Sequence, residues 1–109
     1  LANLYNQINP NKAEHHYLKV LELTPNDSMP YINISNYYLK NTKYKKCVKT
    51  LEEALSKQLG TKEIFNNLGI AYLATKENEK SKSMFEQALK IDPSYKPALD
   101  NLENLKKID

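Results

Sequence analysis

Apolar residues recur at every third or fourth position along most of this 109-residue chain. The spacing is regular between residues 31 and 38 and again between residues 47 and 55. Steps of three and four residues place apolar side chains on one face of a helix. The pattern therefore predicts two amphipathic helices, over about Met29–Lys40 and Lys43–Lys57, and an all-α fold.

Turn-forming residues separate these helices from their neighbours. Residues 24–28, Thr-Pro-Asn-Asp-Ser, precede the first helix, and Asn41 with Thr42 divides it from the second. Gly60 followed by Thr61 is typical of a glycine that ends one helix and a threonine that caps the next. Near the C-terminus we expect Ser94 to cap a last helix and Pro97 to lie in its first turn.

The sequence also matches itself at an offset of 34 residues, large on large and small on small. The aligned pairs are Tyr31/Phe65, Ile34/Leu68, Ser35/Gly69, Tyr38/Tyr72, Cys47/Ser81, Leu51/Phe85, Ala54/Ala88 and Leu55/Leu89. Each unit contains two amphipathic helices. One such unit cannot bury its own apolar face, so about three or more have to stack.

The repeating residues resemble the tetratricopeptide repeat, which reads W-x2-L-G-x2-Y…A-x3-F…A…P over 34 residues. One copy consists of Phe65, Leu68, Gly69, Tyr72, Ser81, Phe85, Ala88 and Pro93. A second consists of Tyr31, Ile34, Ser35, Tyr38, Cys47, Leu51 and Ala54, with Leu59 where the family has Pro. An incomplete third consists of Ala2, Tyr5, Ala13, Tyr17, Val20 and Pro25. The resemblance implies a right-handed superhelical solenoid of antiparallel helix pairs.

The repeat divides the single domain, residues 1–109, into four units. They are a partial repeat at 1–27, repeats at 28–61 and 62–95, and a C-terminal capping helix at 96–109 with Leu99, Leu102 and Leu105 at helical spacing. The first unit is seven residues shorter than the others (34 − 27). We therefore expect the C-terminal end of a longer array, with an open N-terminal face.

Residues with catalytic or metal-binding chemistry are scarce. Gly60 and Gly69 are too few for a phosphate-binding loop. Cys47 is the single cysteine, and its place among small packing residues favours a buried thiol. His15 and His16 are adjacent, so on a helix they diverge and cannot chelate a metal together. We expect no enzyme activity, no cofactor and no bound metal.

The charge of the chain is modest and comes from lysine alone on the basic side. Sixteen lysines oppose 13 acidic residues, and residues 28–61 hold most of the excess, with six lysines against two glutamates. Tyr37 and Tyr44 among these lysines would suit nucleic acid, but the absence of Arg favours a solvated surface. No apolar run could span a membrane and no signal peptide opens the chain. We expect neither nucleic-acid nor membrane partners, and favour a cytoplasmic location.

Asparagine carries the more specific signal. Asn33, Asn67 and Asn101 lie 34 residues apart. If the first helix of each pair lines a concave face, as the family resemblance implies, these amides form a ladder. A primary amide both donates and accepts, so each can pair with one peptide unit of an extended chain. The candidate groove residues are Asn33, Asn36, Asn67, Asn101, Ile70 and Lys40. The alternative is compositional bias, because the chain contains 13 asparagines.

One subtype of the family grips the acidic C-terminus of heat-shock chaperones with a two-carboxylate clamp. It uses Lys and Asn in the first repeat, Asn in the second, and Lys and Arg in the third. Asn3 and Asn33 match the two asparagines, but Glu63 and Asn67 replace the third-repeat cations. An acidic side chain there opposes a carboxylate ligand, so we do not expect a clamp of this type.

We therefore expect a protein–protein interaction scaffold that binds an extended peptide or partner segment in its concave groove. The alternative is a structural spacer or self-association segment of a longer array, with the contact made through the N-terminal face around Leu1–Tyr5.

Overall fold

The computed structural model describes residues 10–108 and confirms the all-α prediction. Six helices and no strand occur in these residues. They are α2 (Pro10–Leu23), α3 (Ser28–Lys40), α4 (Tyr44–Ser56), α5 (Lys62–Ala74), α6 (Asn78–Ile91) and α7 (Lys96–Ile108). The suggested self-association face around Leu1–Tyr5 lies outside the described residues.

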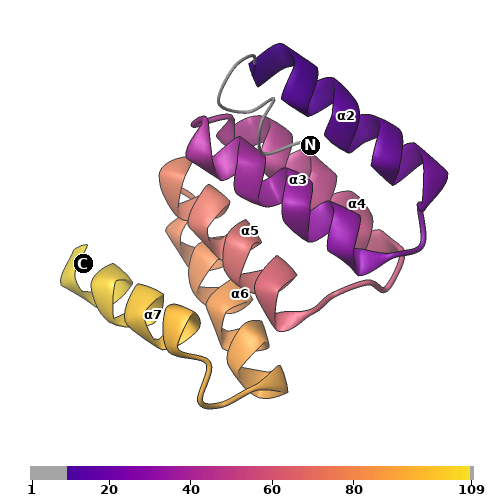
Figure 1. The fold of residues 1–109 in the computed structure, drawn as a ribbon. Coiled ribbons are helices and arrows are strands. Elements are labelled where there is room, and N and C mark those ends of the chain that lie inside the picture. The colour runs from indigo at the N-terminus through magenta and orange to yellow at the C-terminus, as the bar shows by residue number, and fades with distance from the viewer. Residues whose placement is uncertain (1–9, 109) are drawn as a thin grey trace.

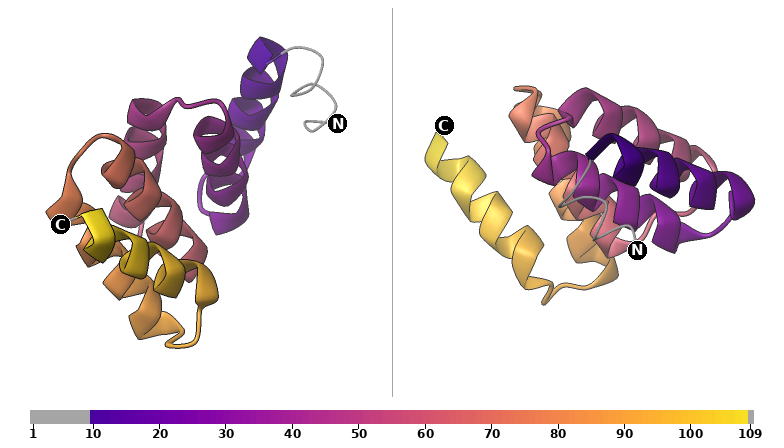
Figure 2. Two further views of the ribbon diagram at one scale, coloured as in Figure 1. Left: turned by 90° about the vertical axis from the view of Figure 1, so that its left-hand side faces the viewer. Right: turned by 45° about the horizontal axis from the view of Figure 1, so that its top comes forward.

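The helices form a stack of antiparallel pairs (Figure 1). Helix α3 packs against α4, and α5 packs against α6. The second helix of each pair also contacts the first helix of the next unit, so α4 packs on α5 and α6 on α7. Helices α2 and α7 lie at opposite ends of the stack in both views of Figure 2. The stack measures 38 × 26 × 21 Å.

The core follows the 34-residue repeat. The largest side chains with no exposed surface come from both units and include Tyr31, Ile34, Leu51, Leu68 and Phe85. One apolar cluster joins α2, α3, α4 and α5, and a smaller one joins α6 to α7 around Phe85 and Ala98. Because these clusters lie between helices that are distant in sequence, each pair is stabilised by its neighbours in the stack.

Small residues hold the two helices of each pair close together. The Ser81 hydroxyl donates to the Gly69 carbonyl at 2.7 Å, and the Cys47 thiol faces the Ser35 carbonyl at 3.9 Å, in the same positions of the two repeats. A Cβ atom at Gly69 would lie 2.5 to 2.9 Å from three carbons of the Phe85 ring. Glycine at this position therefore leaves room for an aromatic ring across the pair.

One tyrosine in each complete repeat links its helix pair to the helix that precedes the pair. Tyr38 donates its hydroxyl to Glu14 of α2 at 3.1 Å, and Tyr72 donates its hydroxyl to Glu52 of α4. Both rings are almost fully buried, so each tyrosine adds apolar packing and one polar link between units.

Two of the predicted helix ends are wrong. Gly60 does not end α4, because that helix stops at Ser56 and Gln58 takes the left-handed backbone with φ of 62°. Ser94 does not cap α7, which begins two residues later, and its hydroxyl donates to Asp92 at 2.9 Å. The prediction for Thr61 is confirmed, since its side chain accepts from the Ile64 amide at 3.2 Å.

The contact between Gly69 and Phe85 predicts a coupled pair of substitutions. Gly69→Ala should lower the free energy of unfolding by about 1 kcal/mol, because overpacking costs about 1–3 kcal/mol and the better helix propensity of Ala returns about 1 kcal/mol. In a Phe85→Leu background the same substitution should be neutral or stabilising, since the ring is gone. Chemical denaturation of the four proteins of this cycle measures the coupling. An equal effect of Gly69→Ala in both backgrounds would contradict the steric argument.

Candidate functional site

The first helices of successive units contact one another, α3 with α5 and α5 with α7, and the face that they form is here called the inner face. Helices α3 and α5 lie side by side in Figure 1. All six predicted groove residues come from these helices, and five of them occupy matching repeat positions: Asn33, Asn36, Asn67, Asn101 and Ile70. Lys40 is exposed in the last turn of α3. Asn33 and Asn36 are also exposed, so their amides reach solvent.

Asn67 lies between two helices and is only 8% exposed. Its amide nitrogen donates to the Ser35 hydroxyl at 2.9 Å and to the Asn36 carbonyl oxygen at 2.8 Å. Both N–H groups therefore join α5 to α3. Ser35 is itself held in place, because its hydroxyl donates to the Ile32 carbonyl at 2.8 Å.

Asn101 makes the corresponding link between α7 and α5. Its amide nitrogen donates to the Asn66 carbonyl oxygen at 3.0 Å, and Asn66 is 5% exposed. Sequence reasoning did not find Asn66, because the preceding repeat has Ile32 in that place and the 34-residue pattern carried no polar signal there. An asparagine directly before Asn67 was the only hint.

These bonds use some of the hydrogen-bonding groups of the inner-face amides and leave others for a ligand. Asn36 contributes its carbonyl oxygen to the bond with Asn67, so its own two N–H groups remain for another partner. Asn67 and Asn101 contribute their N–H groups, so their carbonyl oxygens remain. The exposed residues of α3 thus offer donors, and α5 and α7 offer acceptors. Ile70 is half-buried and packs beside the Phe85 cluster.

Two lysines of the basic stretch are engaged with one carboxylate. Glu14 of α2 pairs with Lys43 at 3.0 Å and with Lys46 at 2.9 Å, and it also accepts from Tyr38. Burial by itself would raise the pKa of Glu14, but the hydrogen bonds from Lys46, Lys43 and Tyr38 together lower this pKa below its usual 4.5. The network ties α2 to the first complete helix pair.

Cys47 has the environment of an inert packing residue. It has no exposed surface, and burial raises the pKa of its thiol to about 12, so the sulfur stays protonated at neutral pH. Within residues 10–108, no group of three or more His, Cys, Asp or Glu side chains could hold a metal ion. In the same part of the chain no helix is both long enough and apolar enough to cross a membrane.

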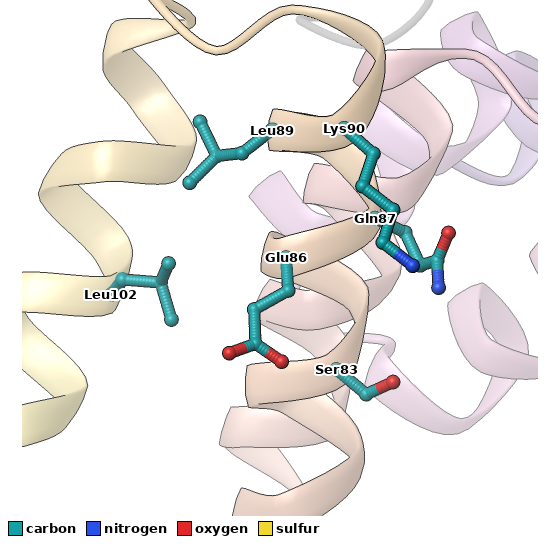
Figure 3. A pocket seen from close by; sticks show the side chains of 6 residues that line it. All are labelled: Ser83, Glu86, Gln87, Leu89, Lys90 and Leu102. Carbon is teal, nitrogen blue, oxygen red and sulfur yellow. The ribbon is translucent and has the colours of Figure 1, made fainter.

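A hollow lies away from the inner face, between α6 and α7 (Figure 3). Leu89 and Leu102 approach each other across it, and Ser83, Glu86, Gln87 and Lys90 of α6 form its polar side. The sequence analysis placed Leu89 and Leu102 among the apolar packing residues and assigned no role to the four polar ones, whose mixture of charges selects no ligand chemistry.

The position of Asn67 predicts unequal effects for two members of the asparagine series. Asn67→Ala should lower the free energy of unfolding by about 1–2 kcal/mol, because it removes two hydrogen bonds at a buried site. Asn33→Ala should change it by less than about 0.5 kcal/mol, because Asn33 is exposed. Urea denaturation of both variants tests this difference, and similar losses for the two would contradict the structural role of Asn67.

The lowered pKa of Glu14 predicts a pH dependence of stability. A carboxyl whose pKa is lower in the folded state stabilises the protein above its unfolded pKa, and this contribution disappears as pH falls through the folded value. Glu14→Gln should therefore cost about 1 kcal/mol near neutral pH and progressively less below about pH 4.5. Glu86→Gln, at an exposed position in the middle of α6, is the matched control and should change stability little at any pH. Thermal unfolding at several pH values measures both, and a pH-independent loss would contradict the network.

Comparison with known proteins identifies the repeat. The tetratricopeptide repeat family matches residues 62–95 and, through a second description of the same repeat, residues 16–49. The chain is 31% identical over 104 residues to the human Protein O-mannosyl-transferase TMTC3. This alignment covers 93% of the chain but only 11% of the human protein.

Solved structures of low sequence identity share the fold. The first TPR of Spaghetti (RPAP3), bound to the HSP90 peptide SRMEEVD, superposes with a TM-score of 0.87 at 19% identity, covering 98% of this chain and 86% of that one. The Arabidopsis OM64 TPR domain gives 0.86 at 19% identity, covering 99% and 90%. The second TPR domain of human RPAP3, in complex with the HSP70 peptide SGPTIEEVD, gives 0.84 at 22% identity, covering 96% and 88%. With its repeating helix pairs and these matches, the chain belongs to the tetratricopeptide repeat family.

Proposed function

We propose that this domain is a protein–protein interaction scaffold that binds an extended peptide segment of a partner on its inner face. The observation that carries the proposal is the row of exposed amide groups on α3 beside the remaining amide oxygens of α5 and α7. An extended peptide alternates N–H and C=O groups, and primary amides can pair with both. Two of the similar structures contain bound peptides, which supports a peptide as the ligand here.

The amide groups have different roles in this proposal. Asn33 and the Asn36 nitrogen donate to carbonyl groups of the peptide. The carbonyl oxygens of Asn67 and Asn101 accept from its N–H groups, while their nitrogens keep the helices in register. Lys40 and Ile70 supply a charged and an apolar margin. Such contacts recognise the peptide backbone, so they give affinity with little selectivity for side chains.

The charges of the inner face argue against the acidic tails of heat-shock chaperones as its ligand. Glu63 is half-exposed in the first turn of α5, where the clamp subtype would need a cation. The chain contains no Arg for bidentate recognition of a carboxylate. The proposed ligand of the inner face is therefore an internal extended segment whose backbone is recognised.

The chemistry of the described side chains supports binding without catalysis. The buried thiol of Cys47 is protonated, and no nucleophile–base pair stands on the inner face among the residues described. The transferase name of the human relative belongs to a protein of which the matched segment is 11%. We infer that this segment binds rather than catalyses in any longer protein that contains it.

The test is a peptide selected from a random phage-displayed library with the purified domain. Asn33→Ala combined with Asn36→Ala should weaken its binding about tenfold to a hundredfold, because each lost hydrogen bond is worth about 1 kcal/mol. Far-ultraviolet circular dichroism should still show a folded helical protein, but Asn36→Ala also removes the oxygen that accepts from Asn67. Asn33→Ala alone, at an exposed position, avoids that loss and should weaken binding about fivefold. Fluorescence anisotropy measures the affinity.

Two controls make this result specific. Asn26→Ala removes an exposed amide in the turn before α3 and should leave the affinity unchanged. A peptide of the same composition in scrambled order should bind within about threefold if the backbone is recognised. Wild-type affinity in the double variant would refute binding by the asparagine row. Light scattering at several concentrations distinguishes peptide binding from the alternative, self-association.

A further inference from the structure

One edge of the stack carries six of the 16 lysines. There α3 and α5 end and α4 begins (Figure 1). Its lysines are Lys40, Lys43, Lys45, Lys46, Lys49 and Lys76, here called the basic edge. No acidic residue occurs between Ser28 and Thr50. The charge is therefore a local property of this edge and not of the whole chain.

Most of this charge has no counterion within the protein. Glu14 forms ion pairs with both Lys43 and Lys46, so two lysines share one carboxylate. None of the residues from 10 to 108 forms an ion pair with Lys40, Lys45, Lys49 or Lys76. These four side chains are exposed. Glu77, which follows Lys76 directly in the sequence, pairs with Lys80 instead.

An open hollow of about 590 Å³ lies within the basic edge. Its lining residues are Thr42, Lys43, Tyr44, Lys45, Lys46, Ala74 and Thr75. Ala74 and the half-buried Tyr44 give it apolar surface, which the methylene stems of the lysines extend. The ammonium groups of Lys43 and Lys46 pair with Glu14, whereas Lys45 is exposed and in no ion pair with a residue between 10 and 108. No acidic side chain lines it. The hollow combines room for one apolar side chain with cations around it.

We propose that the basic edge is a second interaction site, which binds an acidic peptide segment of a partner protein and seats one apolar side chain in the hollow between Tyr44 and Ala74. The carboxylates of the segment pair with the lysines that lack counterions. This contact adjoins the inner face, because Lys40 at the end of α3 belongs to both surfaces, but it uses none of the asparagines. A partner could occupy both surfaces with two different segments, which would raise its overall affinity.

Other anionic partners fit this edge less well. Nucleic acid is bound chiefly through Arg and Lys with several stacking rings, whereas the basic edge has no Arg and one half-buried tyrosine in its hollow. A membrane surface would need apolar side chains that insert among the lipids. None of the large exposed apolar residues lines the hollow; they are Leu18, Val20, Leu23, Met29, Ile91 and Leu99.

The test uses a fluorescein-labelled peptide, Glu-Asp-Glu-Leu-Glu-Asp-Glu, and fluorescence anisotropy. We expect the peptide to bind, and the Lys45→Glu variant to bind it at least about tenfold more weakly. Raising the salt concentration from about 0.05 to 0.5 M should weaken binding to the wild-type protein by a similar factor. Lys45 is exposed in the first turn of α4, where a negative side chain interacts favourably with the helix dipole, so the variant should fold normally. Lys90→Glu, an equal charge reversal at an exposed position in the last turn of α6, is the matched control and should bind like wild type.

Further arms separate the possible ligands and sites. The peptide with Gly in place of Leu should bind more weakly, and the Gln/Asn analogue should not bind. The Asn33→Ala/Asn36→Ala variant should bind the acidic peptide normally, which distinguishes failure of this site from failure of the inner face. The proposal is overturned by no binding of the acidic peptide, by equal binding to Lys45→Glu, or by tighter binding of an oligothymidylate or of phosphatidylserine vesicles at the same ionic strength.

Discussion

Each helix pair closes around one contact between small residues. Ser81 bonds to the Gly69 carbonyl, and Cys47 occupies the same position against Ser35. Only small side chains permit this approach of two helix backbones, and the remaining space is filled by a larger group such as the Phe85 ring. A single pair is too thin to bury its own apolar side chains, so the next unit has to cover them. The stack follows from this single requirement.

Contacts between units are more varied than contacts within them. Tyr38 and Tyr72 make the same kind of contact, in which a buried tyrosine donates its hydroxyl to a glutamate of the preceding helix. The asparagines do not repeat in this way. Asn67 donates to Asn36 and Ser35, whereas Asn101 donates to Asn66, at a different place in the repeat. Asn67 and Asn101 are therefore 34 residues apart but form different hydrogen bonds.

The same amides bear on both stability and the proposed binding. A side-chain amide has two kinds of group, and the inner face uses the N–H groups of Asn67 and Asn101 to join helices while leaving their oxygens. Substitution of these two residues disturbs folding as well as any peptide contact. Asn33 separates the two effects, because it is exposed. Asn36 is also exposed, but its oxygen accepts from Asn67 and so contributes to both. The basic edge adds a second chemistry, electrostatic and salt-dependent, beside the neutral hydrogen bonding of the inner face.

The sequence by itself determined the fold class and nearly all of the core. Tyr31, Leu51 and Phe85 could be assigned to the interior because burial follows helical periodicity, which is a local property of the chain. The ends of helices were harder. Gln58, and not Gly60, adopts the left-handed conformation after α4, where the Leu59 amide donates to the Ala54 carbonyl and closes the last turn of the helix. Only the tertiary structure decided which amides are available and which lysines lack counterions. Those facts depend on Asn66, Asn36 and Glu14, which approach their partners from helices 29 to 35 residues away and leave no mark on local spacing.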